Sequence, residues 1–375
     1  MRNTIELHKR WKDNPSKGEV FTPEELVKEM LDKIPTSVWE NPTSTFLDPC
    51  MGKGTFLIDI LRRLTTIYGY SKEDAMSRIY GYDVRVKYIN YLERGGLKNV
   101  FHKDFLIEKF DMKFDVIVGN PPYNNSGKIK GSKQTSGTSL WLQFLKKTPT
   151  LLKEDGICSF IVPAAVGNTN SLGWKSLKNN QIISLTTGIN EKYFNVGTSI
   201  SNIVFKNNKP TNSHLINDIM VNRDLVAILP NDCDEMSLSI MQKISSLNPM
   251  KEWNRDYYPT FMEKSEDKTV VGMSFLDRSP QYKVQHKDEL VNRGLDSVNI
   301  CWIETEYPDE MIRLMTSKLF NFFSKQTMLS GNLSIGMVRS LSVPNNWYNL
   351  ETDSDIYQTY GLTEDEINYV ESYVV

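Results

Sequence analysis

The stretch STFLDPCMGKGTFLIDILRRLTTIY, which covers residues 44–68, changes its pattern twice. Residues 44–49 predict a short strand that runs into an aspartate, whereas residues 55–68 carry apolar side chains at helical spacing. Gly52 and Gly54 lie between them, and glycine allows the backbone to pass close to a ligand. The N-terminus of the following helix favours a carboxylate or phosphate group. This order predicts a strand, a binding turn and a helix.

The same turn also fits a purely structural role, as a tight connection between strand and helix. Lys53 is followed by Gly54, and no glycine stands at the earlier position that a Walker A loop requires. The turn also lacks the GxGxxG pattern of a dinucleotide site. The glycines alone therefore leave both interpretations open.

Strands and helices alternate through the first half of the chain. Further strands are predicted at residues 78–84, 114–120, 156–164 and 199–207, and a helix is predicted at residues 140–152. Such alternation is typical of an α/β fold, so we expect a mostly parallel sheet with helices on both faces.

A change in residue composition and periodicity near residue 206 predicts a second domain. The stretch NNKPTNSH is typical of a linker, and the segment after it is irregular and rich in Met, Asn and aromatic residues. Near the end, Thr363 and Glu366 form a capping-box signature that predicts a short helix. We therefore expect a first domain at residues 1–206, a second at 207–350 and an acidic helical tail at 351–375.

The composition is that of an ordinary soluble globular protein, with 375 residues, 39% hydrophobic and 24% charged. The sequence has no apolar run of about 18 residues and no secretory h-region at its start, so we expect a cytoplasmic location. The four cysteines and four histidines show no metal-ligand spacing, and no metal is expected. A net charge of −2 does not indicate a nucleic-acid binder, although lysines cluster locally. Such clusters also fit a solvated surface.

The stretch KFDVIVGNPPY predicts a strand that ends in a rigid polar tetrapeptide, Asn120 to Tyr123. Two prolines cannot continue a central strand, and they hold the amide oxygen of Asn120 and the carbonyl of Pro121 in fixed positions. Two fixed acceptors suit the two N–H bonds of an exocyclic amine, and Tyr123 offers a face on which a heterocycle stacks. Open α/β sheets bind ligands at this end of their strands. A proline turn with an incidental tyrosine is the alternative.

Three further segments fit a nucleoside-binding site. Asp83 ends the strand at 78–84, where an acid accepts hydrogen bonds from ribose hydroxyls, although a plain strand-end acid is an alternative. Asp104 and Phe105 suit the amine and the face of an adenine ring. Thr22 as N-cap, with proline next and glutamate at N3, explains residues 21–23 as a helix start. A functional interpretation adds that these residues close over a cofactor.

Together these motifs resemble the gamma class of S-adenosylmethionine-dependent N6-adenine DNA methyltransferases, the TaqI-like restriction-modification methylases. FTP at 21–23, DPCMGKGTF at 48–56 and NPPY at 120–123 stand in the order of that class, and the match covers about residues 15–206. The resemblance implies a Rossmann-like, mostly parallel, seven-stranded methyltransferase sheet, followed by a C-terminal target-recognition domain. It also implies double-stranded DNA as partner, and any restriction endonuclease would be a separate chain.

The family roles carry over by position. For the cofactor, the resemblance implies contacts from Phe21, Thr22, Pro23, Asp48, Pro49, Gly52, Gly54, Phe56, Asp83, Asp104 and Phe105. For the flipped adenine, it implies Asn120, Pro121, Pro122 and Tyr123, with Phe194, or else Phe205, stacking on the other face. For DNA, we expect contacts from Lys128, Lys130 and Lys133, with Arg255, Arg293 and Arg339 as further candidates.

The sequence leaves other functions open, namely other amino-group methyltransferases and a non-catalytic recognition subunit. Protein-glutamine and ribosomal-RNA guanine methyltransferases share an NPPY-type motif, but their extra domain usually precedes the catalytic core. Cytosine-N4 enzymes more often carry serine at the first position, so Asn120 favours adenine. A DNA-recognition subunit without turnover is the remaining alternative, although every expected motif is intact.

Overall fold

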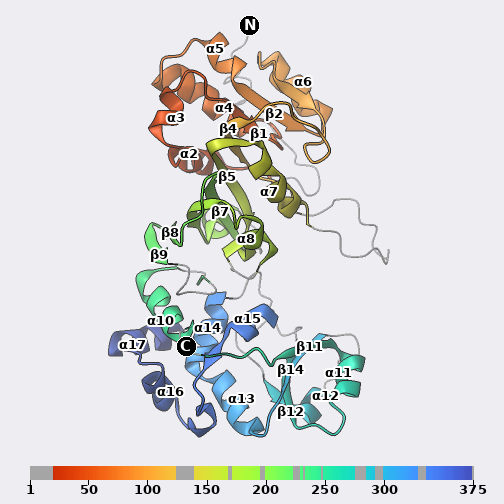
Figure 1. The fold of residues 1–375 in the computed structure, drawn as a ribbon, viewed down its shortest axis with the longest axis vertical. Coiled ribbons are helices and arrows are strands. Elements are labelled where there is room, and N and C mark those ends of the chain that lie inside the picture. The colour runs from red at the N-terminus through yellow and green to blue at the C-terminus, as the bar shows by residue number, and fades with distance from the viewer. Residues whose placement is uncertain are drawn as a thin grey trace. The chain divides into compact units, whose positions relative to one another are not determined.

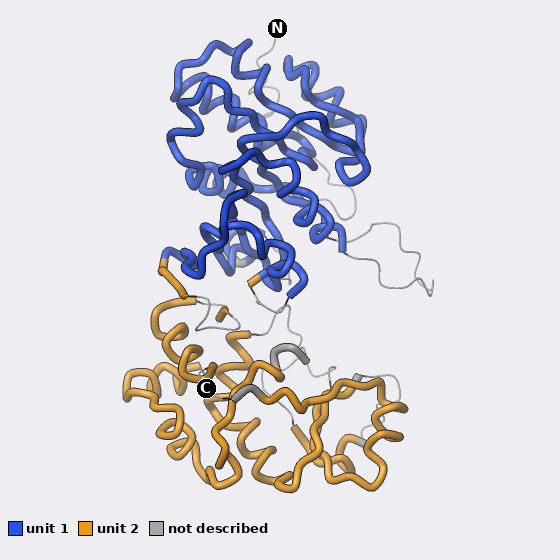
Figure 2. The backbone as a smooth tube through the Cα atoms, in the orientation of Figure 1, with its two compact units in different colours: residues 1–166, 171–196, 200–218 blue, residues 167–170, 197–199, 219–375 orange. Residues whose placement is uncertain are grey.

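The structure is a computed structural model, and it describes residues 20–123, 139–167, 171–194, 199–222, 229–230, 233–245, 248–274, 284–291, 299–327 and 335–373. The chain forms two compact units (Figure 2). The first contains residues 1–166, 171–196 and 200–218, and the second contains residues 167–170, 197–199 and 219–375. The first unit thus extends beyond the predicted boundary at residue 206, because a further strand of the sheet follows it.

A single sheet dominates the first half of the chain (Figure 1). Its strands are β1 (Phe46–Asp48), β2 (Ile79–Asp83), β3 (Val100–His102), β4 (Phe114–Gly119), β5 (Leu152–Pro163), β6 (Gln181–Thr186), β7 (Ile200–Lys206), β8 (Ser213–Ile216) and β9 (Ile219–Asn222). Their order in the sheet is β3-β2-β1-β4-β5-β7-β6-β8-β9. The strands predicted from the sequence are confirmed, and β8 and β9 extend the expected seven strands to nine.

The pairing confirms a mostly parallel α/β sheet. β1 runs parallel to β2 and β4, and the β2–β3, β4–β5 and β6–β8 pairs are parallel as well. β7 is antiparallel to both of its neighbours, β5 and β6. Because β1 to β5 are parallel, the carboxyl ends of β3, β2, β1 and β4 meet at one edge of the sheet.

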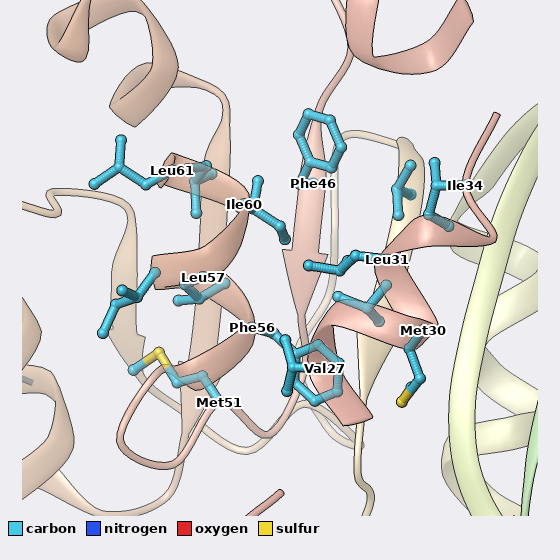
Figure 3. Packing of buried hydrophobic residues seen from close by; sticks show 14 of the residues in the cluster. Val27, Met30, Leu31, Ile34, Phe46, Met51, Phe56, Leu57, Ile60 and Leu61 are labelled. Atoms are coloured by element: carbon cyan, nitrogen blue, oxygen red, sulfur yellow. The ribbon is translucent and has the colours of Figure 1, made fainter. Parts of the chain in front are cut away.

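Helices flank this sheet. They are α2 (Glu24–Asp32), α3 (Thr36–Glu40), α4 (Thr55–Arg62), the π-helix η1 (Arg63–Ile67), α5 (Lys72–Ser77), α6 (Val86–Arg94), α7 (Leu140–Leu151), the 3₁₀ turn η2 (Ala164–Gly167), α8 (Leu172–Ser176) and α9 (Ile189–Tyr193). Figure 3 shows α2 and α4 packing against Phe46 of β1 through Val27, Leu31 and Ile60. These side chains are at most 1% exposed, so they form the centre of the apolar core.

The opposite face of the sheet carries an aromatic cluster. Successive side chains of a strand point to opposite faces. Ile79 of β2 belongs to the core under α2 and α4, so Tyr80 and Tyr82 point away from it. The ring of Tyr82 lies 5.1 Å from that of Phe110. Phe144 of α7 stacks at 5.1 Å on Phe105, so α7 covers this second face.

The predicted helix at 55–68 is divided. α4 ends at Arg62, and the last turn continues as a π-helix. The hydroxyl of Thr65 donates to the Leu61 carbonyl at 2.8 Å, and that of Thr66 donates to the Arg62 carbonyl at 2.6 Å. Hydroxyls that bind carbonyls one turn earlier loosen the regular helical ladder, which accounts for the change.

The helix that follows the FTP segment begins one residue later than predicted. Pro23, with φ −59° and ψ 147°, is the N-cap of α2, and no side chain caps this helix end. The prediction of Thr22 as N-cap is therefore wrong. Thr22 is 8% exposed and faces the interior, and extended Pro23 displaces the helix start to Glu24.

The second unit combines a small antiparallel sheet with helices. Its elements are α10 (Glu235–Ser245), β10 (Asn248–Pro249), β11 (Asn254–Tyr257), α11 (Tyr258–Lys264), β12 (Val270–Ser274), β13 (Gln285–His286), α12 (Lys287–Val291), β14 (Asn299–Glu304), α13 (Pro308–Thr316), α14 (Lys318–Thr327), α15 (Ile335–Ser340), β15 (Ser342–Val343), η3 (Trp347–Asn349), α16 (Asp353–Thr359) and α17 (Glu364–Tyr373). The larger sheet has the order β11-β14-β12-β13, and its strands pair antiparallel.

The acidic C-terminal segment is part of this second unit and not a separate tail. The predicted capping box is confirmed, because the Thr363 N–H donates to Glu366 Oε2 at 2.7 Å and the Glu366 N–H donates to Thr363 Oγ1 at 3.3 Å. The Glu366 carboxylate also accepts from Ser239 at 2.7 Å and pairs with Lys243 at 2.5 Å. These contacts attach α17 to α10.

Candidate functional site

The predicted site residues converge on one edge of the sheet. Asp104 follows β3, Asp83 ends β2, Asp48 ends β1 and Asn120 follows β4. Because the sheet order is β3-β2-β1-β4, these residues form a row in that order. The row brings together segments far apart in the sequence, at the edge where open α/β sheets bind ligands.

Asp48 is a buried carboxyl group at the centre of this row. It is 1% exposed, and its Oδ1 accepts the backbone N–H of Cys50 at 3.0 Å. Burial, together with the nearby charge of Asp83, raises the pKa of Asp48 to about 8. A carboxyl group with this pKa is mostly protonated at neutral pH in the cofactor-free protein.

Cys50 joins the turn after β1 to the tetrapeptide after β4. Its thiol donates to the Asp48 carboxylate, and its sulfur accepts the backbone N–H of Asn120. A Cβ added to Gly119 would lie 3.0 Å from Asp48 Oδ1 and 3.5 Å from Cys50 Sγ. Burial raises the pKa of the Cys50 thiol, so it stays protonated. The strand end before Asn120 is therefore packed directly on the Asp-Pro-Cys turn.

Asp83 fixes the glycine turn. Its Oδ2 accepts the Gly52 N–H at 2.9 Å, and its Oδ1 accepts the Arg85 N–H at 2.9 Å. Gly54 precedes α4 with φ +83°, and a Cβ there would lie 2.6 Å from Leu92 Cδ2. Glycine is required at this position by both backbone and packing.

The FTP segment lies against this glycine turn. A Cβ added to Gly52 would lie 3.9 Å from Phe21 Cε1. The ammonium of Lys53 stands 4.7 Å from the centroid of the Phe21 ring, and Tyr88 meets the same ring edge-on at 6.4 Å. Phe21 is half-buried, so one aromatic side chain covers the turn and keeps part of its surface exposed. Pro23, next to buried Thr22, is half-buried as well.

Asp104 and Phe105 form a turn after β3. Asp104 Oδ1 accepts the Leu106 N–H at 2.9 Å, and the Lys103 N–H donates to the Asp83 carbonyl at 3.1 Å. A backbone hydrogen bond thus links the turn at Asp104 to Asp83 at the end of β2. The Phe105 ring is 1% exposed and stacks on Phe144, so a ligand could reach its face only if that packing opened.

The tetrapeptide ends β4 with its polar side chains partly accessible. Asn120 and Tyr123 are half-buried, Pro121 is buried and Pro122 is exposed. Tyr123 packs against the core under α2 and α4. Burial raises the pKa of the Tyr123 hydroxyl, so the ring stays neutral.

Other predicted site residues lie in the core. Phe56 is 3% exposed and packs with Val27 between α2 and α4 (Figure 3). Phe194 is 8% exposed and belongs to the same apolar cluster against which Tyr123 packs, whereas Phe205 is fully buried in β7. Pro49 is buried beside Gly119. Phe194 and Tyr123 thus share one apolar cluster.

The predicted DNA contacts are only partly within the described residues. Lys128, Lys130, Lys133 and Arg293 lie outside them. Arg255 on β11 and Arg339 on α15 are exposed. Arg339 Nε donates to the Trp253 carbonyl at 2.7 Å, which fixes one end of its guanidinium.

In the described part of the chain, no group of three or more His, Cys, Asp and Glu side chains is arranged to hold a metal ion. Within the same residues, no helix is both long and apolar enough to cross a membrane.

The sheet order defines a Rossmann-like α/β fold. Residues 63–194 match the Eco57I restriction-modification methylase family, which confirms the resemblance to restriction-modification methylases.

Two curated relatives agree with this match. The modification methylase CviBIII of Paramecium bursaria Chlorella virus NC1A is 30% identical over 222 residues, which cover 57% of this chain and 56% of the relative. The type II methyltransferase M.VspI of Vibrio sp. (strain 343) is 25% identical over 263 residues, with coverages of 61% and 60%. The chain thus spans less than two thirds of either relative.

A solved protein of Listeria monocytogenes is also similar. It is assigned to the class I S-adenosylmethionine-dependent methyltransferases. The TM-score is 0.45 at 16% identity, and the similarity covers 57% of this chain and 73% of that one.

Proposed function

We propose that this chain is a site-specific DNA methyltransferase. In this proposal it transfers the methyl group of S-adenosylmethionine to N6 of an adenine that is flipped out of duplex DNA. The observation that carries the proposal is the row of Asp104, Asp83, Asp48 and Asn120 along one sheet edge. The names of the relatives, a modification methylase and a type II methyltransferase, support it.

The residues at the edge fit S-adenosylmethionine by their chemistry. The Asp83 carboxylate accepts two backbone N–H groups, and carboxylate oxygens are acceptors of the kind that ribose hydroxyls would bind. Asp104 would accept a hydrogen bond from the adenine amine. The Asp48 carboxyl and the glycine turn, covered by Phe21, suit the methionine end. The cofactor supplies an electrophilic methyl group when it is bound.

Asn120 and Pro121 would hold the amine that receives the methyl group. The amide oxygen of Asn120 and the carbonyl of Pro121 accept its two N–H bonds, which directs the nitrogen lone pair toward the methyl donor. The hydrogen bond from the Asn120 N–H to Cys50 ties this group to the cofactor turn. Catalysis then depends on position and electrostatics. No strong base is required, because the alkylated nitrogen is acidic and releases its proton readily.

The target base would stack on Tyr123. Stacking of a base on an aromatic ring contributes about 1–3 kcal/mol, which offsets much of the cost of flipping. Phe194 is the proposed partner on the other face, and its membership of the cluster that Tyr123 contacts supports this.

The second unit is proposed to read the DNA sequence. Arg255 and Arg339 are exposed there, and both are candidates for base or phosphate contacts. Lys128, Lys130 and Lys133 follow the tetrapeptide in the sequence, and they would contact DNA phosphates. A separate restriction endonuclease is a proposed partner in the cell.

Single-molecule sequencing of DNA from cells that express the chain tests this proposal. We expect N6-methyladenine at one fixed sequence context, and no signal from cells that express Asn120→Ala. The purified variant should still bind S-adenosylmethionine in calorimetry, because Asn120 is not proposed to hold the cofactor. Modified cytosine, or an unmodified genome with methylated RNA or protein, contradicts the proposal.

A further inference from the structure

Lys147 of α7 is anchored in a site that no motif of the sequence indicates. Its ammonium donates to the carbonyl oxygens of Phe105 at 2.6 Å, Leu106 at 3.2 Å and Glu108 at 2.6 Å. An ammonium group has three N–H donors and no acceptor, so these contacts use all of them. The same atom stands 5.1 Å and 5.2 Å from the centroids of the Phe105 and Phe110 rings.

The carbonyls that Lys147 binds belong to the turn that begins at Asp104. On the other side of this turn, the Asp104 carbonyl accepts the N–H groups of Ile107 at 3.3 Å and Glu108 at 3.0 Å. The Asp104 carboxylate itself accepts the Leu106 N–H at 2.9 Å. The turn is therefore closed by its own amides, and its outward carbonyls converge on one ammonium group.

The pKa of the Lys147 ammonium reflects both its burial and the acidic side chains near it. Burial lowers the pKa of the Lys147 ammonium, while the charges of Asp104 and Glu108 oppose this effect. Removal of the ammonium would leave three carbonyl oxygens without their donor, and an unpaired polar group in such a place is unfavourable. The turn would then be free to open.

We infer that Lys147 is a positioning residue for the adenine end of the cofactor site. Lys147 binds the carbonyl oxygens of the turn that begins at Asp104 and so holds this turn in place. The turn keeps Asp104 aligned with Asp83, because the Lys103 N–H donates to the Asp83 carbonyl. Lys147 also keeps the Phe105 ring packed in the aromatic cluster, so the adenine partner is the Asp104 carboxylate together with the backbone of the turn. This inference rests on the proposed function.

The test compares three variants of the full chain. Lys147→Met keeps the side-chain length and removes all donors, and Lys147→Arg keeps the charge. Lys146→Met is the matched control, because Lys146 is the exposed neighbour on the same helix. Hydrogen exchange of the cofactor-free proteins reports on residues 104–108, and calorimetry reports the affinity for S-adenosylhomocysteine.

We expect Lys147→Met to speed exchange at residues 104–108 and to weaken affinity about 10- to 100-fold, by analogy with partners that orient metal ligands. At saturating cofactor its turnover should match wild type, so the effect falls on KM for S-adenosylmethionine and not on kcat. Lys147→Arg should restore part of the affinity, and Lys146→Met should behave as wild type.

Unchanged exchange in Lys147→Met overturns the inference, and so does faster exchange with unchanged affinity. A fall in kcat with unchanged affinity overturns it as well. A wild-type chain that binds no S-adenosylhomocysteine contradicts the proposed function. That outcome is recognised in the wild-type protein alone, before any variant is compared.

Discussion

Replacing Asp48 by asparagine should stabilise the cofactor-free protein, and the gain should grow with pH. The pKa of Asp48 is about 8 in the folded protein because the carboxyl group is buried, whereas its ordinary value is 3.8. A carboxyl group with a raised pKa favours the folded state only while it is protonated. Stability is therefore lost as the pH rises from the ordinary value to the folded value, and the loss levels off above that.

The size of the effect follows from these two pKa values. Each unit of pKa difference corresponds to about 1.4 kcal/mol, so between about pH 5.5 and about pH 8.5 the wild type loses about 3 kcal/mol through this group. Asparagine has nearly the same shape, carries no charge and still offers an oxygen to the Cys50 N–H. It should remove this pH-dependent loss.

Urea unfolding of wild type and Asp48→Asn at both pH values measures the difference in their free energies of unfolding. We expect the difference in the free energy of unfolding, Asp48→Asn minus wild type, to widen by about 3 kcal/mol from the lower to the higher pH. The variant should also lose affinity for S-adenosylmethionine, because the carboxylate is proposed to face its methionine end. A gap that stays constant with pH would refute the reasoning that Asp48 is buried and protonated.

Two further substitutions test the glycine turn and its acidic partner. Gly54→Ala should cost about 2–5 kcal/mol in urea unfolding, because it combines a positive φ with a collision. Gly188→Ala shares the positive φ but meets nothing within 4 Å, so a loss of about 1–2 kcal/mol is expected there, and equal losses would contradict the packing argument. Asp83→Ala should weaken the binding of S-adenosylmethionine about 10- to 100-fold in calorimetry, because a ribose would lose charged acceptors. An unchanged dissociation constant would contradict the ribose role.

Much of the fold follows from local pattern. The first strand, the glycine turn and the helix after it are predicted because a strand-end acid, two glycines and an amphipathic run stand in close succession. The capping box at Thr363 is equally local, since its two partners are one helical turn apart. The π-helix after α4 was not predicted, because the threonine hydroxyls that accompany it act on backbone carbonyls and leave the apolar spacing unchanged.

Features that depend on distant segments were not predictable in the same way. The sequence predicts Phe105 as an accessible aromatic residue beside an acid. In the structure, α7 instead stacks Phe144 on the Phe105 ring. In the sequence, Cys50 carries no sign of a functional role. Its contact with Asn120 exists only because β1 and β4 are neighbours in the sheet. Lys147 lies about 40 positions from the turn that it binds, so no local spacing indicates its role.

The identity of the methylated nucleoside tests the central claim most directly. Purified chain is incubated with duplex DNA and isotopically labelled S-adenosylmethionine, and the DNA is digested to nucleosides for mass spectrometry. We predict that the label is found in N6-methyldeoxyadenosine with the wild type and is absent with Asn120→Ala. Label in a cytosine nucleoside, or equal labelling by the two proteins, would contradict the account of how Asn120 holds the target amine.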